Sequence, residues 1–176
     1  ARYQAELANG FGNLASRTTA MIERYFEGII PPEGTITDGD RKIQEIVRDA
    51  AANADAAIDR LAIDEAVAAI WTIVDALNGY ITENEPWALA KDDAQRERLG
   101  TVLYTAAEGL RALAVLMSPV IPKACETLWI ALGAAETLGR LRDQPIRDAG
   151  TWGQLKPGSS VNGLAPLFPR VESTID

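Results

Sequence analysis

The chain has 176 residues, 47% of them hydrophobic and 24% charged, with a net charge of −8, one cysteine and no histidine. This composition is typical of one soluble globular domain. The absence of histidine excludes Ser–His–Asp catalysis, and together with the single cysteine it excludes the usual zinc sites. The negative charge also argues against a protein that coats nucleic acid non-specifically, although it leaves room for a small base-reading site.

No run of about 18 uncharged apolar residues occurs, so no membrane partner is expected. The N-terminal residues include neither an initiator Met nor a signal-peptide pattern, and we expect a cytoplasmic piece of a longer protein. A single cysteine, Cys125, rules out an internal disulfide and is expected to be an inert buried thiol.

Apolar residues spaced three and four apart predict the first two helices. One helix is expected over residues 3–27, ended by Gly28 and the following prolines. A second, over residues 38–61, can be capped by Thr37 or Asp38. A polar stripe lies away from the apolar face of the first helix and contains Asn9, Asn13, Arg17 and Arg24.

A third helix, expected from Asp64, runs into the sequence Glu85-Pro86-Trp87. Pro86 has no N–H and disfavours helix in Glu85, so this helix is expected to end there and a new one can begin with Pro86 in its first turn. Trp87 then lies at a corner. Its indole is either a wedge that closes the core, the commoner case by spacing alone, or a platform for a flat ligand.

A fourth helix is expected from Asp92 or Asp93 to Ser118, and a fifth from Pro119 to Leu132, with Gly133 as its C-cap. The later residues are rich in glycine and proline. The expected architecture is all-α: a five-helix bundle over residues 1–140, and an extended tail over 141–176 that packs back on the bundle or on another domain.

No catalytic residue and no metal site are predicted. The glycine-rich stretch 156–163 lacks the GK[ST] ending of a phosphate-binding loop. Asn13 and Arg17, four residues apart, carry the donors and acceptors that can read the edges of a base, but by spacing alone a solvated stripe explains them as well. We expect Trp71 and Trp129 to be buried and Trp87 to be partly accessible.

Four blocks of sequence occur in a familiar order: GNLASR at 12–17, NGYITENEPWALAK at 78–91, SPVIP at 118–122 and LFPR at 167–170. Together they resemble the C-terminal anticodon-binding domain of methionyl-tRNA synthetases, and the resemblance spans essentially the whole chain. The proline–tryptophan elbow alone is shared with the related class Ia synthetases for leucine, isoleucine and valine. When the elbow is combined with the GNLASR block, the sequence resembles the methionine family in particular.

This resemblance implies a bundle that reads the CAU anticodon of methionine tRNA. By position, Trp87 would stack on the first anticodon base, Asn13 and Arg17 would hydrogen-bond to bases, and Pro86 would shape the elbow under the indole. Asp75 would help to reject wrong anticodons, and Asn78 would lie at the same site. The partners implied are the anticodon loop and the catalytic domain of the same parent chain, with no DNA.

The family's HIGH-like and KMSKS-like signatures do not occur in the sequence. The resemblance therefore implies that the parent is a methionine–tRNA ligase that uses ATP with Mg²⁺ in another domain, and that these residues hold no cofactor and do not catalyse the reaction. Two alternatives remain open: another class Ia synthetase, or a helical protein-interaction module. Several cations are candidates for contacts with the tRNA backbone, or else solvated surface charges: Arg24, Lys91, Arg96, Arg98 and Lys123.

Overall fold

Five helices of ten or more residues build the structure, a computed structural model that describes residues 6–164 and 166–168. They are α2 (Asn13–Phe26), α3 (Asp38–Asp59), α4 (Ile63–Asn84), α6 (Arg96–Met117) and α7 (Pro122–Ala131). Shorter turns of helix join them: η1 (Leu7–Gly12), α5 (Pro86–Leu89), η2 (Asp93–Gln95), α8 (Ala134–Leu138), η3 (Leu141–Asp143) and η4 (Ile146–Asp148). The all-α class and the five main helices are confirmed.

Local sequence explains most helix ends. Thr37 caps α3 through a capping box with Asp40, as one of the two predicted caps. Asp92 caps the short η2 by accepting from the amide of Ala94, and α6 follows it directly. Gly133, at φ 73°, follows the end of α7 in the left-handed conformation that glycine tolerates best.

The first helix is predicted over residues 3–27, of which 3–5 lie outside the described residues. Residues 7–12 form the π-helix η1, and α2 follows it directly. One predicted helix start is wrong. The fifth helix starts at Pro122 and not at Pro119, because the amides of Val120 and Ile121 both turn back to the carbonyl of Met117. Pro122 then occupies the first helical turn, where its missing N–H costs nothing.

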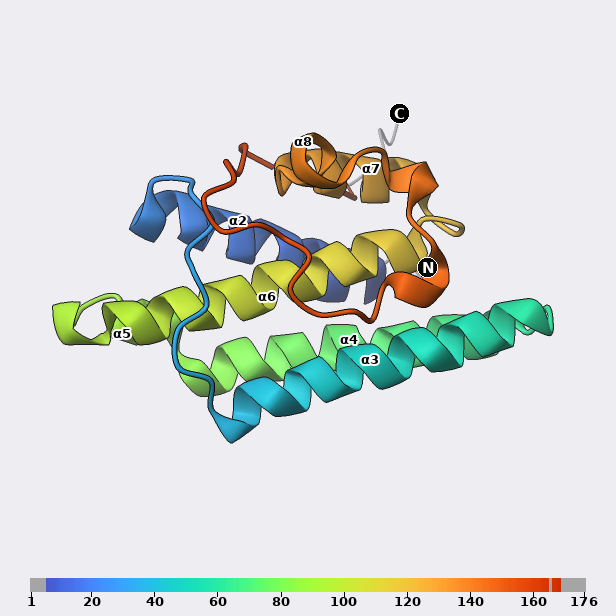
Figure 1. Ribbon diagram of the computed structural model, residues 1–176, viewed down its shortest axis with the longest axis horizontal. Helices are drawn as coiled ribbons and strands as arrows, with labels where there is room; N and C mark the ends of the chain where they lie inside the picture. The colour runs from blue at the N-terminus through green and yellow to red at the C-terminus, as the bar shows by residue number, and fades with distance from the viewer. Residues whose placement is uncertain (1–5, 165, 169–176) are drawn as a thin grey trace, which may run out of the picture.

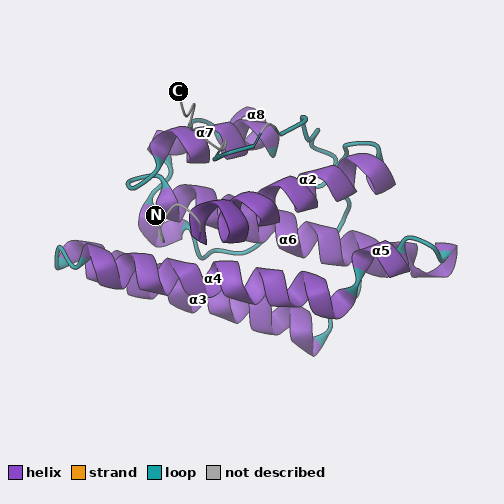
Figure 2. Cartoon of the chain, turned by 180° about the vertical axis from the view of Figure 1, so that it is seen from behind, coloured by secondary structure: helices purple, strands orange, loops and turns teal. Residues whose placement is uncertain are grey.

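Helix α6 is the centre of the molecule (Figure 1). It lies between the antiparallel pair α3 and α4 on one side and α2 with α7 and α8 on the other, and Figure 2 shows the same layers from behind. Every residue from Leu99 to Met117 is buried. The stretch Asp93–Met117 is long and apolar enough to span a membrane, but its most apolar part is wholly buried among the other elements, as in a core helix.

The tail packs along α6 and the loop after α2. Tyr104 donates its hydroxyl to the carbonyl of Leu155 at 2.8 Å. The amide of Ile30 donates to Ser159, and Ile29 and Ser160 form an isolated antiparallel bridge. Phe168, near the end of the described residues, packs on Phe11 with ring centroids 6.3 Å apart. The last two residues of the LFPR block, 169 and 170, lie outside the described residues.

Candidate nucleic-acid interface

The elbow between α4 and α5 sets the position of Trp87. Glu85 adopts a left-handed conformation (φ 47°), as the residue before a proline cannot easily continue a helix. Its carbonyl accepts from the amides of Ala88 and Leu89 at 2.8 and 3.1 Å, which starts α5 at once. Pro86 is buried, whereas the adjacent Trp87 is 39% exposed. The expected accessibility of Trp87 is therefore confirmed.

Helix α2 brings a cation to this indole. Asn13 and Arg17 are both exposed on α2, and the guanidinium carbon of Arg17 lies 5.9 Å from the centroid of the Trp87 ring. This is the range of a cation–π interaction. The structure thus places an aromatic face beside a guanidinium fork, although the two residues are far apart in the sequence.

A polar network that the sequence did not predict supports the elbow from inside. Arg98 donates to both carboxylate oxygens of Asp40 at 2.6 and 3.1 Å and to the side chain of Asn84 at 2.7 Å. Asn84 in turn donates to the carbonyl of Tyr80 at 2.8 Å, and the Tyr80 hydroxyl donates to Asp40. Because Asn84 is the last residue of α4, the network fixes the end of the helix that precedes Pro86.

Asp40 carries the charge of this network and is completely buried. Burial by itself raises its pKa, but hydrogen bonds from Arg98, Tyr80 and the amide of Thr37 outweigh that effect, and the pKa of Asp40 lies below its ordinary value. The Tyr80 hydroxyl, buried and donating to a carboxylate, has its pKa raised. At neutral pH the network is therefore an ion pair with a neutral tyrosine.

The five candidate backbone-contact cations separate into different surroundings. The interpretation of Arg98 as a solvated surface charge is wrong, because its side chain is only 22% exposed and forms an ion pair with Asp40. Lys123 lines a shallow apolar hollow on α7 beside Phe168. Lys91 is exposed in the turn after α5. Arg24 lies on α2 with Arg17, and Arg96 lies over Phe26 at the end of α2; both arginines are exposed.

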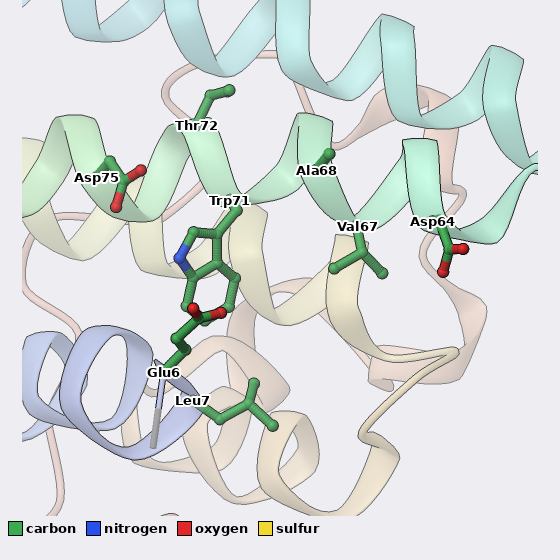
Figure 3. A pocket seen from close by; sticks show the side chains of 8 residues that line it. All are labelled: Glu6, Leu7, Asp64, Val67, Ala68, Trp71, Thr72 and Asp75. Atoms are coloured by element: carbon green, nitrogen blue, oxygen red, sulfur yellow. The ribbon is translucent and has the colours of Figure 1, made fainter. Parts of the chain in front are cut away.

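Asp75 faces a different hollow from Trp87. It lines a cavity of about 390 Å³ between α4 and the start of the described chain, together with Trp71 and Leu7 (Figure 3). In Figure 3 the Trp71 indole points from α4 toward Glu6 and Leu7 and forms one wall of this cavity. The expectation that Trp71 is buried is wrong, since it is only partly covered, whereas Trp129 is fully buried and donates to Gly139.

The Asn78 side chain is hydrogen-bonded to the backbone of the bundle. Its side-chain nitrogen donates to the carbonyl of Gly10 at 3.4 Å and to that of Val74 at 3.1 Å. It thereby ties η1 to α4. Of the six residues named for anticodon reading, the structure brings Arg17, Trp87 and Pro86 together, with Asn13 one turn away on α2, while Asp75 and Asn78 lie farther back along α4. Among the described residues no cluster of His, Cys, Asp or Glu could hold a metal ion.

Comparison with known families decides what this bundle is. The model of the family "Anticodon binding domain of methionyl tRNA ligase" matches residues 30–174. The chain belongs to this family. A match to the methionine family removes the synthetases for leucine, isoleucine and valine as alternatives.

Individual relatives of this anticodon-binding domain support the same family assignment. A methionine–tRNA ligase of Streptomyces coelicolor is 47% identical over 98% of the chain, and one of Deinococcus radiodurans is 42% identical over 99%. The methionyl-tRNA synthetase of Mycobacterium tuberculosis in complex with methionyl-adenylate has a TM-score of 0.86 with 28% identity over 96% of the chain. The chain spans 32%, 25% and 32% of these proteins, respectively.

Proposed function

We propose that this chain reads the CAU anticodon of methionine tRNA, and that in a longer parent it serves a ligase that joins methionine to that tRNA with ATP and Mg²⁺ bound in another domain. The observation that carries the proposal is the pairing of a half-exposed indole, Trp87, with Arg17 on the neighbouring helix. Single-stranded loops are read by stacking splayed bases on aromatic side chains and bonding their edges.

In this proposal the first anticodon base, a cytosine, stacks on the Trp87 ring and displaces the Arg17 guanidinium to the edge of the base, where its donors can bond. Asn13, one turn away on α2, offers both a donor and an acceptor. Pro86 is buried in the first turn of α5 and would keep this turn in place. Asp75, farther back along α4, would help to reject wrong anticodons. Asn78 has a weaker place in this proposal, because its amide nitrogen is already bonded to the carbonyls of Gly10 and Val74.

The test is a titration of the chain with a stem-loop that carries CAU and with one in which the first C is changed to U. We expect weak but selective binding of the CAU loop, because one good base-edge contact discriminates by about 1–3 kcal/mol. Trp87→Ala should weaken CAU binding about 5- to 150-fold, since stacking contributes about 1–3 kcal/mol per base. Trp71→Ala is the matched control, as it removes a partly covered indole from a different cavity.

Circular dichroism of both tryptophan variants checks that the helices persist. Equal affinity of the unchanged chain for the two loops would overturn anticodon reading. If Trp87→Ala unfolds the bundle while Trp71→Ala does not, Trp87 is a structural wedge and the helical interaction module becomes the better explanation.

A further inference from the structure

Three arginines lie over aromatic rings on one side of the molecule. Arg17 covers Trp87, Arg24 lies 5.7 Å from the ring centroid of Tyr25, and Arg96 lies 4.3 Å from that of Phe26. They come from α2 and from the first turn of α6. These are all the cation–π contacts among the described residues, and all three involve α2.

From Trp87, the three arginines follow α2 toward its C-terminal end. Arg17 and Arg24 are seven residues apart on α2, which places them on the same face about 10 Å from each other. Arg96 is fixed at the end of this row, because one of its terminal nitrogens donates to the carbonyl of Tyr25 at 3.2 Å. The row starts beside Trp87 and ends where α2 ends.

Charge pairing separates these arginines from every other described arginine except Arg142. Seven described arginines form an ion pair with a carboxylate: Arg41, Arg48, Arg60, Arg98, Arg111, Arg140 and Arg147. None of the ion pairs between described residues includes Arg17, Arg24 or Arg96. In a chain of net charge −8, three exposed arginines that pair with no described carboxylate are complementary to an anion from outside.

Stacking prepares a guanidinium for phosphate. The ring holds the planar group by its face, so that the N–H donors along its edges stay available, and a fixed fork loses less entropy when it binds an anion. Proteins that hold single-stranded nucleic acid combine a cationic track for the backbone with aromatic rings for the bases. The residues from Trp87 to Phe26 contain both parts.

We infer that Arg24 and Arg96, which lie over the rings of Tyr25 and Phe26, bind successive phosphates of the RNA strand that leaves the base stacked on Trp87. This inference rests on the proposed function for the identity of the RNA. It adds a binding track that carries affinity but no base selectivity, since phosphate contacts position the nucleic acid and do not report its sequence.

Salt dependence distinguishes this track from base reading. Each phosphate contact to a single strand contributes about 0.7 to the slope of log K against log salt concentration, which is about fivefold in affinity near 0.1 M salt. We expect Arg24→Gln and Arg96→Gln each to lower the slope by about 0.7 and to weaken the CAU loop and the changed loop equally. Arg96→Lys keeps the charge and should keep the slope while losing affinity.

Arg142→Gln is the matched control, because Arg142 is exposed, has no ion pair with a described residue and lies in η3, away from α2. It should leave both slope and affinity unchanged. If Arg24→Gln and Arg96→Gln behave like Arg142→Gln while the CAU loop is still preferred, the phosphate track is wrong and anticodon reading stands. If the unchanged chain prefers neither loop, anticodon reading fails, and the slopes of the two variants still decide the track. Circular dichroism confirms that the variants remain folded.

Discussion

At the scale of single residues, the contact of Arg17 with Trp87 is weak enough to be replaced. An exposed cation–π interaction contributes about 0.5–1 kcal/mol, whereas a base stacked on an aromatic ring contributes about 1–3 kcal/mol. Under the proposed function, a base would therefore take the place of the guanidinium with a net gain. In the structure the arginine lies over the Trp87 ring.

Cys125, unlike the exposed Trp87, is a potentially reactive side chain that solvent does not reach. It is fully buried, and burial raises the pKa of its thiol to about 12. Because the thiolate is the nucleophile, we expect no reaction with Ellman's reagent at pH 8 in the folded chain and one thiol per chain after unfolding in urea. Rapid release of the coloured product without urea would show that α7 opens to solvent.

At the scale of elements, Asp40 connects three helices. It closes the capping box of α3, accepts from Tyr80 on α4 and pairs with Arg98 on α6. A carboxylate is tolerated in this buried position only because each of its oxygens has a donor. The same residues hold the last turn of α4, so the stability of the elbow depends on them.

We expect Asp40→Asn to lower the free energy of unfolding by about 2–4 kcal/mol, because it leaves Arg98 without its anion. The pKa of Asp40 is lower in the folded than in the unfolded state, so its stabilisation is present above the unfolded value, about 3.9, and is lost as the pH falls through the folded value. Urea unfolding at pH 7 and at pH 3 should therefore show a large difference between the chain and the variant at pH 7 and a smaller one at pH 3.

Asp38→Asn is the control for this measurement. Asp38 stands in the same first turn of α3 and pairs with Arg41, but both side chains are exposed, and such pairs contribute about 0–1 kcal/mol. A loss for Asp40→Asn as small as that for Asp38→Asn would mean that the network does not stabilise the bundle.

The elements also show what a sequence can and cannot predict. Caps and prolines act locally, so Thr37 and Pro86 marked helix boundaries correctly. Periodicity identifies an inner face but not how many neighbours surround a helix, and the burial of α6 on all sides was therefore missed. Arg98 resembled a surface charge because its partner is remote in the sequence. The contact of Arg17 with Trp87 likewise depends on the packing of α2 beside α5.

At the scale of the whole molecule, a buried ion pair joins the tail to the central helix. Glu108 and Arg111 are one turn apart on α6 and almost wholly buried. Glu108 accepts from Arg111 and from the amides of residues 153, 154 and 155. Arg111 donates to the carbonyls of Ala149 and Thr151. A segment without regular structure thus has its backbone groups satisfied by two charged side chains.

Glu108→Gln removes the charge that holds three backbone amides and Arg111, while it keeps the shape of the side chain. Breaking one partner of a buried pair costs about 3–5 kcal/mol, so we expect a loss of that order in thermal or urea unfolding. Hydrogen exchange should locate the effect. The amides of residues 153–155 should exchange faster, whereas the amides of α3 and α4 should lose only the protection that the lower global stability accounts for. Glu136→Gln, at an exposed position on α8, is the control and should change neither the stability nor the exchange rates of residues 153–155. Uniform acceleration along the chain, with no extra effect at 153–155, would mean that the tail does not depend on Glu108.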